Sequence, residues 1–74
     1  MYSFKVEPSD VRKPVIERTM SSNKAIELIP VLIQIAKHEY KFVNPVAVYM
    51  GKGKFLIADL SNPNLYAIVD IEAV

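Results

Sequence analysis

The chain has 74 residues, of which 51% are hydrophobic and 23% charged, enough for one small globular domain and too little for a second. Nine Lys and Arg against eight Asp and Glu give a formal net charge of +1, so no strong overall field selects nucleic acid or anionic lipid. The absence of cysteine excludes disulfides, thiolate catalysis and cysteine-ligated zinc.

Neither the N-terminal residues nor the longest apolar stretch resembles a targeting or membrane segment. Residues 1–7 alternate apolar and polar side chains, unlike the charged and then apolar parts of a signal peptide. The longest apolar stretch, 28–36, is interrupted by Pro30 and Gln34 and is shorter than the roughly 18 to 20 residues that cross a bilayer. We therefore expect a cytoplasmic protein without a membrane segment.

The N-terminal segment 1–7 is predicted to be a half-buried strand, because Tyr2, Phe4 and Val6 fall on one side of an extended chain. Segment 8–21 is polar and proline-containing, which disfavours a regular helix or ladder, and we expect an extended, mobile arm there. The arm is either a solvated linker or a segment that becomes ordered on a partner. Its basic and apolar residues are Arg12, Lys13, Val15, Ile16 and Arg18.

Apolar residues at three- and four-residue steps predict one helix over 22–41. The predicted core stripe comprises Ile26, Ile29, Ile33, Ala36 and Tyr40, widened by Leu28, Leu32 and Ile35. Pro30 either kinks this helix at a cost of about 3 kcal/mol or occupies the first turn of the main helix. In the second case 25–29 forms a separate short turn or strand.

After Pro45 the hydrophobic period changes to two, which predicts a meander of three antiparallel strands over 46–72. The strands are 46–50, 54–60 and 65–72, joined by turns at 51–53 and 61–64. Glycines in the first turn tolerate the positive φ of a tight hairpin. The face formed by Leu65, Ala67, Val69 and Ile71 is predicted to cover the helix.

These elements predict an α+β fold for the single domain 1–74, with one helix packed on a small antiparallel sheet. The sheet consists of the N-terminal strand and the three-strand meander, and the extended arm lies between the first strand and the helix. The pattern leaves open which edge of the meander the first strand joins.

No residue cluster in the sequence has the spacing of a catalytic or metal site. His38 is the single histidine and is interpreted as a solvated surface residue, since no motif places a nucleophile and an acid beside it. Asp59, Asp70 and Glu72 are interpreted as solubilising strand residues rather than an acid–base pair. We expect no enzymatic activity, no cofactor and no metal.

Side chains of the meander suggest a partner surface. Alternation places Tyr49, Tyr66 and Ile68 on the sheet face opposite the helix, where an exposed apolar patch would mark a docking site. The alternative is that the arm folds back over them and completes the core. The predicted partner-binding residues are Tyr2, Phe4, Val6, Arg12, Lys13, Val15, Ile16, Arg18, Tyr49 and Tyr66.

We therefore expect a non-enzymatic regulator that binds a host protein through the N-terminal strand, the arm and one sheet face. The alternative is a small nucleic-acid-binding module with phosphate contacts from arm and hairpin and base stacking on Tyr49 or Tyr66. Its basic residues would be Arg12, Lys13, Arg18, Lys52 and Lys54. The near-neutral net charge favours the protein-binding function.

In size and in its order of strand, arm, helix and meander, the chain resembles the small phage-encoded regulators of bacterial RNA polymerase, such as that of a Xanthomonas phage. The resemblance covers the proportions of the whole chain and rests on no motif, so no functional residue is carried over from it. It implies a polymerase subunit as the partner, altered transcription as the effect and the host cytoplasm as the location.

Overall fold

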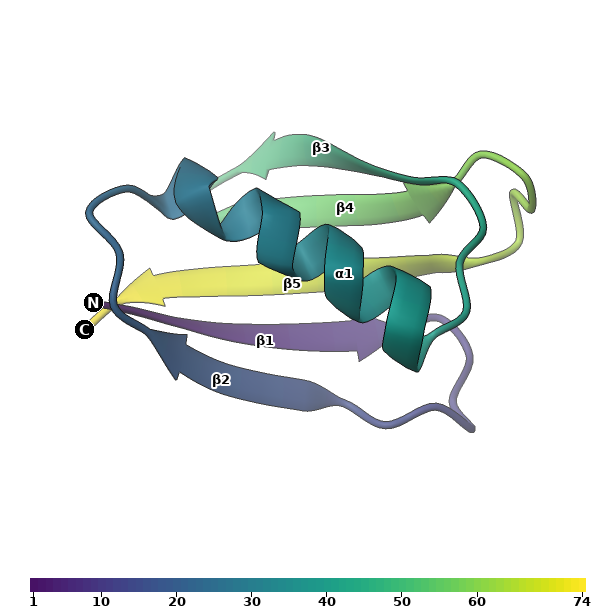
Figure 1. The fold of residues 1–74 in the computed structure, drawn as a ribbon, viewed down its shortest axis with the longest axis horizontal. Helices are drawn as coiled ribbons and strands as arrows, with labels where there is room; N and C mark the ends of the chain where they lie inside the picture. The colour runs from purple at the N-terminus through teal and green to yellow at the C-terminus, as the bar shows by residue number, and fades with distance from the viewer.

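A five-stranded antiparallel sheet carries the α-helix across one of its faces (Figure 1). The computed structural model describes residues 1–74. Its elements are β1 (Tyr2–Pro8), β2 (Ile16–Met20), the 3-10 helix η1 (Ala25–Leu28), α1 (Ile29–Glu39), β3 (Pro45–Gly51), β4 (Lys54–Asp59) and β5 (Tyr66–Ala73). The strand order in space is β2-β1-β5-β4-β3, which confirms the predicted α+β fold class. Neither helical segment has the length and apolar character needed to span a membrane.

The segment predicted as a mobile arm contains a strand of the sheet. β2 pairs antiparallel with β1, with Phe4 opposite Arg18 and Val6 opposite Ile16. Pro8 and Pro14 lie outside β2, so neither proline removes an amide donor from the β1–β2 ladder. Only the loop between the two strands remains irregular.

The first strand joins the meander at its β5 edge and becomes an interior strand, because β2 adds on its other side. Phe4 lies opposite Ile71 and Val6 opposite Val69, and all four side chains are buried under the helix. Past Pro8, the Ser9 amide donates to the Tyr66 carbonyl at 2.8 Å and extends this pairing by one residue.

The α-helix is shorter than predicted, and its proline lies in its first turn. Instead of one helix over 22–41, the four residues of η1 precede the 11 residues of α1. Pro30 lies in the first turn of α1, where its missing amide hydrogen would have no partner in the helix. Of the two alternatives for Pro30, the structure adopts the second.

The buried stripe of the helical segment is Leu28, Leu32, Ile35 and Ala36, a spacing of four, seven and eight residues that keeps one face inward. The predicted centre of the stripe was wrong for Ile26, which is 66% exposed, and for Ile33, which is only partly buried. The stripe meets the inward residues of the strands, so that the core is continuous from α1 to β1, β4 and β5.

The β3–β4 hairpin has the predicted left-handed turn, with φ of 86° at Gly51, 55° at Lys52 and 74° at Gly53. A Cβ on Gly53 would lie 2.6 Å from the Ile71 carbonyl oxygen, whereas a Cβ on Gly51 would meet nothing within 4 Å. Gly53 is therefore required both by its backbone conformation and by the close approach of β5.

Asp59 is a buried structural residue, and its interpretation as a solubilising strand carboxylate was wrong. It is 2% exposed and accepts hydrogen bonds from the amides of Val43 (3.0 Å), Asn44 (3.1 Å) and Ser61 (2.9 Å). The bond from Val43 contributes most to lowering the pKa of Asp59, and those from Ser61 and Asn44 add to it against the opposing effect of burial. The carboxylate thus joins the loops that flank β3 and β5.

Candidate protein-binding surface

An apolar groove lies between the start of the helical segment and one end of the sheet. Both chain termini lie at this end of the sheet (Figure 1). The volume of the groove is about 540 Å³. The residues that define it are Tyr2, Phe55 and Ile71 from inner strands, Tyr49 from β3, and Ile26 and Ile29 from the helical segment. The groove is thus built from four strands and both helical elements.

Two large apolar side chains of the groove are exposed to solvent, Ile26 at 66% and Tyr49 at 63%. The Tyr49 ring packs on Phe55 with centroids 5.1 Å apart, so its position is fixed from below by a buried ring. Covering these side chains with a partner would remove apolar surface from water, which is the main favourable term in protein association.

Helical spacing predicts Ile26 and Ile29 as core residues and does not indicate that they line the groove. The sequence feature that could have indicated this position is Pro30, which favours a helix start. The 3-10 helix η1 ends at Leu28 and α1 begins at Ile29, and a 3-10 helix has about 3.0 residues per turn where an α-helix has 3.6. This change of phase directs Leu28 inward and leaves Ile26 at the rim.

The chemistry of the groove is that of an apolar binding site. Eight of its nine lining residues are hydrophobic, and the side chains that carry polar atoms are those of Tyr2 and Tyr49. No carboxylate or imidazole lines it, and no group of three or more His, Asp or Glu in the structure could hold a metal ion. The groove can bind apolar side chains, but it presents no acid–base pair.

The structure separates the predicted partner-binding residues of the first strand. Tyr2 lines the groove, whereas Phe4 and Val6 are fully buried in the core. The alternation of the strand therefore identified inward side chains correctly, but only Tyr2, near the open end of the sheet, is accessible to a partner.

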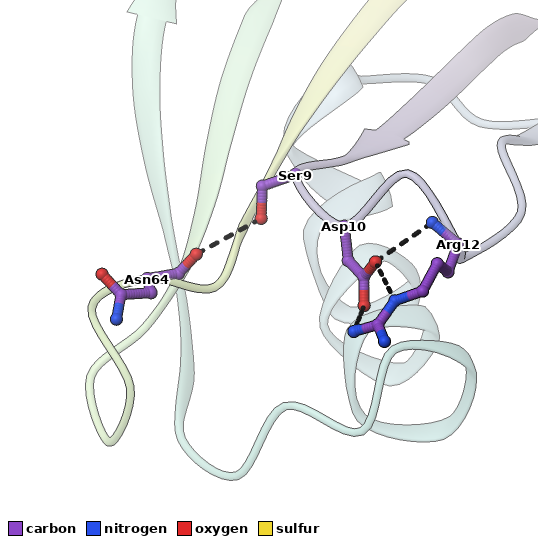
Figure 2. Close-up of polar contacts among 4 residues, drawn as sticks. All are labelled: Ser9, Asp10, Arg12 and Asn64. Atoms are coloured by element: carbon purple, nitrogen blue, oxygen red, sulfur yellow. Dashed lines mark hydrogen bonds and ion pairs between the residues drawn. The ribbon is translucent and has the colours of Figure 1, made fainter.

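The predicted arm residues do not form one surface. Figure 2 shows the Arg12 side chain folded back on Asp10, with Nε and Nη2 donating to the carboxylate at 3.0 and 3.2 Å. These bonds lower the pKa of Asp10. Val15 is exposed, while Ile16 packs against the core. The loop is also anchored by Tyr40, whose hydroxyl donates to the Pro14 carbonyl at 2.8 Å.

Tyr66 and Ile68 lie on the sheet face opposite the helix, as predicted, but Tyr49 does not. Tyr49 lies opposite the buried Phe55 on the helix side. Its neighbour Val48, which lies opposite Leu56, is the residue of β3 that faces away from the helix instead. The alternative in which the arm covers this face is wrong, because β2 extends the sheet instead.

The basic residues of the nucleic-acid alternative are dispersed over the sheet, with Arg18 in the middle of β2. Arg12 and Lys13 belong to the β1–β2 loop, and Lys52 belongs to the β3–β4 hairpin at the other end (Figure 1). Lys54 pairs with Asp70 at 3.3 Å. The structure therefore does not gather these cations into a track along which a phosphate backbone could run.

His38 is exposed, as predicted, and its Nε2 lies 3.0 Å from Gln34 Oε1 one helical turn away. The polar side chains that line the same shallow pocket as His38 are those of Arg18, Gln34 and Glu39, none of which is a hydroxyl or thiol nucleophile. Family models, curated proteins and solved structures give no match to this chain, so its candidate surface is defined by geometry alone.

Proposed function

We propose that this chain is a non-enzymatic regulator that binds a host protein by taking an apolar side chain of that protein into the groove. The observation that carries the proposal is the joint exposure of Ile26 and Tyr49 at the rim of an almost wholly apolar groove. Small-molecule sites usually add several convergent polar groups that orient the ligand. This groove has only tyrosine hydroxyls for that purpose, which favours a protein anchor.

The expected anchor is an aromatic or branched aliphatic residue on a helix or an extended segment. Exposed aromatic and aliphatic residues beside a groove are typical of the centre of a protein–protein interface, where a few side chains supply most of the binding free energy. The resemblance to phage regulators makes bacterial RNA polymerase the first partner to test.

The test compares two exposed apolar positions in one binding assay with purified RNA polymerase. Ile26→Asp places a charge at the rim of the groove and is expected to weaken binding by about thirtyfold or more, as loss of an interface anchor does. Val11→Asp is the matched control, because Val11 is 95% exposed in the distant β1–β2 loop, and we expect no change. Equal affinities of the two variants would contradict the role of the groove.

If the polymerase does not bind, a photoreactive benzoylphenylalanine at position 26 identifies the partner in host extract, with position 11 as the control. The captured protein counts as the partner only when its purified form shows the same difference between Ile26→Asp and Val11→Asp. A partner that is captured equally from both positions would contradict the proposal.

A further inference from the structure

The two edges of the sheet differ in length and in charge. β2 forms one edge with five residues, including Glu17 and Arg18. β3 forms the other with seven residues, Pro45–Gly51, and none of them is charged. Charged side chains, short length, proline and β-bulges protect an edge strand against pairing with another chain. β3 is neither charged nor short, and its Pro45 and its register irregularity between Tyr49 and Gly51 lie at its two ends, so that 46–49 form a regular free edge.

The hydrogen bonds beside β3 identify which of its backbone groups are free. The Leu60 amide donates to the Asn44 carbonyl at 3.0 Å, in register with Pro45 opposite Asp59. Antiparallel pairs alternate between bonded and non-bonded positions, so Val46 and Val48 direct their backbone groups toward β4. The amides and carbonyls of Ala47 and Tyr49 consequently face away from the sheet.

We propose that two copies of this chain pair antiparallel through β3 about a two-fold axis at Val48. This register places Ala47 of each copy opposite Tyr49 of the other, and each opposing pair exchanges two backbone hydrogen bonds. A small side chain then faces a large one on the helix side, and Val48 meets its own copy on the open face. Since β3 contains no charge, no like charges meet within the paired strands.

Exposed apolar side chains on both faces of β3 support a second copy of this chain as the pairing partner. Val48, Tyr49 and Met50 are 50%, 63% and 54% exposed, an unusual run of three apolar residues in water. Pairing covers all three at once, and it continues the sheet into the second copy without moving the helix. The inference rests on the free β3 edge. Ala47 and Tyr49 also line the groove, so the two proposals share these residues and are distinguished by variants at Val48 and Ile26, each of which belongs to one of the two surfaces alone.

The test measures the mass of the full chain in solution by light scattering and sedimentation over a wide range of concentrations. Wild type is expected to shift from monomer to dimer. Val48→Lys brings two lysines together at the axis and is expected to raise the dimer dissociation constant by about a hundredfold or more. Val48→Glu should do the same, and an equimolar mixture of the two variants should recover a heterodimer, which also shows that both are folded.

Thr19→Lys is the matched control, since it places the same charge on the opposite edge strand, β2, and we expect it to dimerise like wild type. Ala47→Pro removes an outward amide while leaving the ladder to β4 in place, and it should be monomeric. A wild type that stays monomeric at every concentration would overturn the proposal, as would a Val48→Lys dimer of unchanged affinity. Ile26→Asp should still dimerise, so failure of the groove proposal and failure of this one are distinguishable.

Discussion

The two faces of the sheet are built from the same strands but differ in how deeply their side chains are buried. On the face under α1, alternate residues such as Phe4, Ile57 and Val69 are almost fully buried. On the open face, apolar residues such as Val48 of β3 and Ile68 of β5 are interspersed with charged residues such as Lys5 of β1. The residues buried on the covered face stabilise the fold, whereas the groove at one end of that face and the β3 edge leave apolar surface free for binding.

The strongest test of this difference between the faces truncates two neighbouring side chains of one strand. Phe4→Ala removes a core side chain that is 1% exposed, and we expect a loss of about 3–5 kcal/mol in the free energy of unfolding. Lys5→Ala, on the other face, should change it by less than about 0.5 kcal/mol. Urea denaturation of both variants checks this, and similar losses would mean that the faces are not distinct.

The hairpin glycines offer a second matched pair. Gly53→Ala combines a positive φ with a Cβ only 2.6 Å from the Ile71 carbonyl oxygen, and we expect a loss of about 1–3 kcal/mol. Gly51→Ala has a similar φ but open space, so its loss should be limited to about 1 kcal/mol. Thermal and urea unfolding measure the difference. A more harmful Gly51→Ala would show that close packing against β5 is not what Gly53 provides.

Asp59 is the buried charged residue of the fold, and its contribution to stability should depend on pH. Its pKa is lowered in the folded state, mainly by the Val43 amide, so its stabilising effect is fully present above the unfolded aspartate pKa of about 3.9. That effect is lost as the pH falls through the lower, folded pKa. We expect Asp59→Asn to be less stable than wild type at neutral pH and to lose less stability between neutral and acid pH.

Denaturation curves at several pH values give this comparison directly. Asp70→Asn is the control, because Asp70 lies on the open face and pairs with Lys54 near solvent, where an ion pair contributes little. Parallel pH curves for wild type and Asp59→Asn would contradict the structural role assigned to the carboxylate.

Alternation in the sequence was sufficient to predict the inward residues of β1 and β5, because the opposite face of β1 is polar and that of β5 carries Asp70 and Glu72. It failed for Tyr49, since β3 is apolar on both sides and its register is set by Phe55 of the neighbouring strand. It could have placed Asp59 inward, two residues beyond the buried Ile57. Alternation did not predict β2 within the proline-containing segment 8–21. This strand forms by pairing with the edge of β1 that β5 leaves free, and that edge exists only in the folded sheet.

The groove and the free edge could not be predicted in this way, because they depend on where separate elements end relative to one another. Ile26 has the spacing of a core residue until η1 changes the phase of the helix at Pro30. The exposed β3 edge likewise follows from the strand order, in which no element covers the outer side of β3. Tertiary arrangement therefore decides which apolar residues are available to a partner.

The smallest expected effect lies at the end of α1, where the chain leaves the helix for the sheet. Lys41 has a φ of 59°, a left-handed conformation in which glycine is not strained, so Lys41→Gly should stabilise the fold by about 0.5–1 kcal/mol. Lys37→Gly, within the last turns of α1, should instead cost about 1 kcal/mol, because glycine is unfavourable inside a helix. Urea midpoints that move in opposite directions for these two variants would confirm that the helix ends before Lys41, and midpoints that both fall would place Lys41 inside the helix.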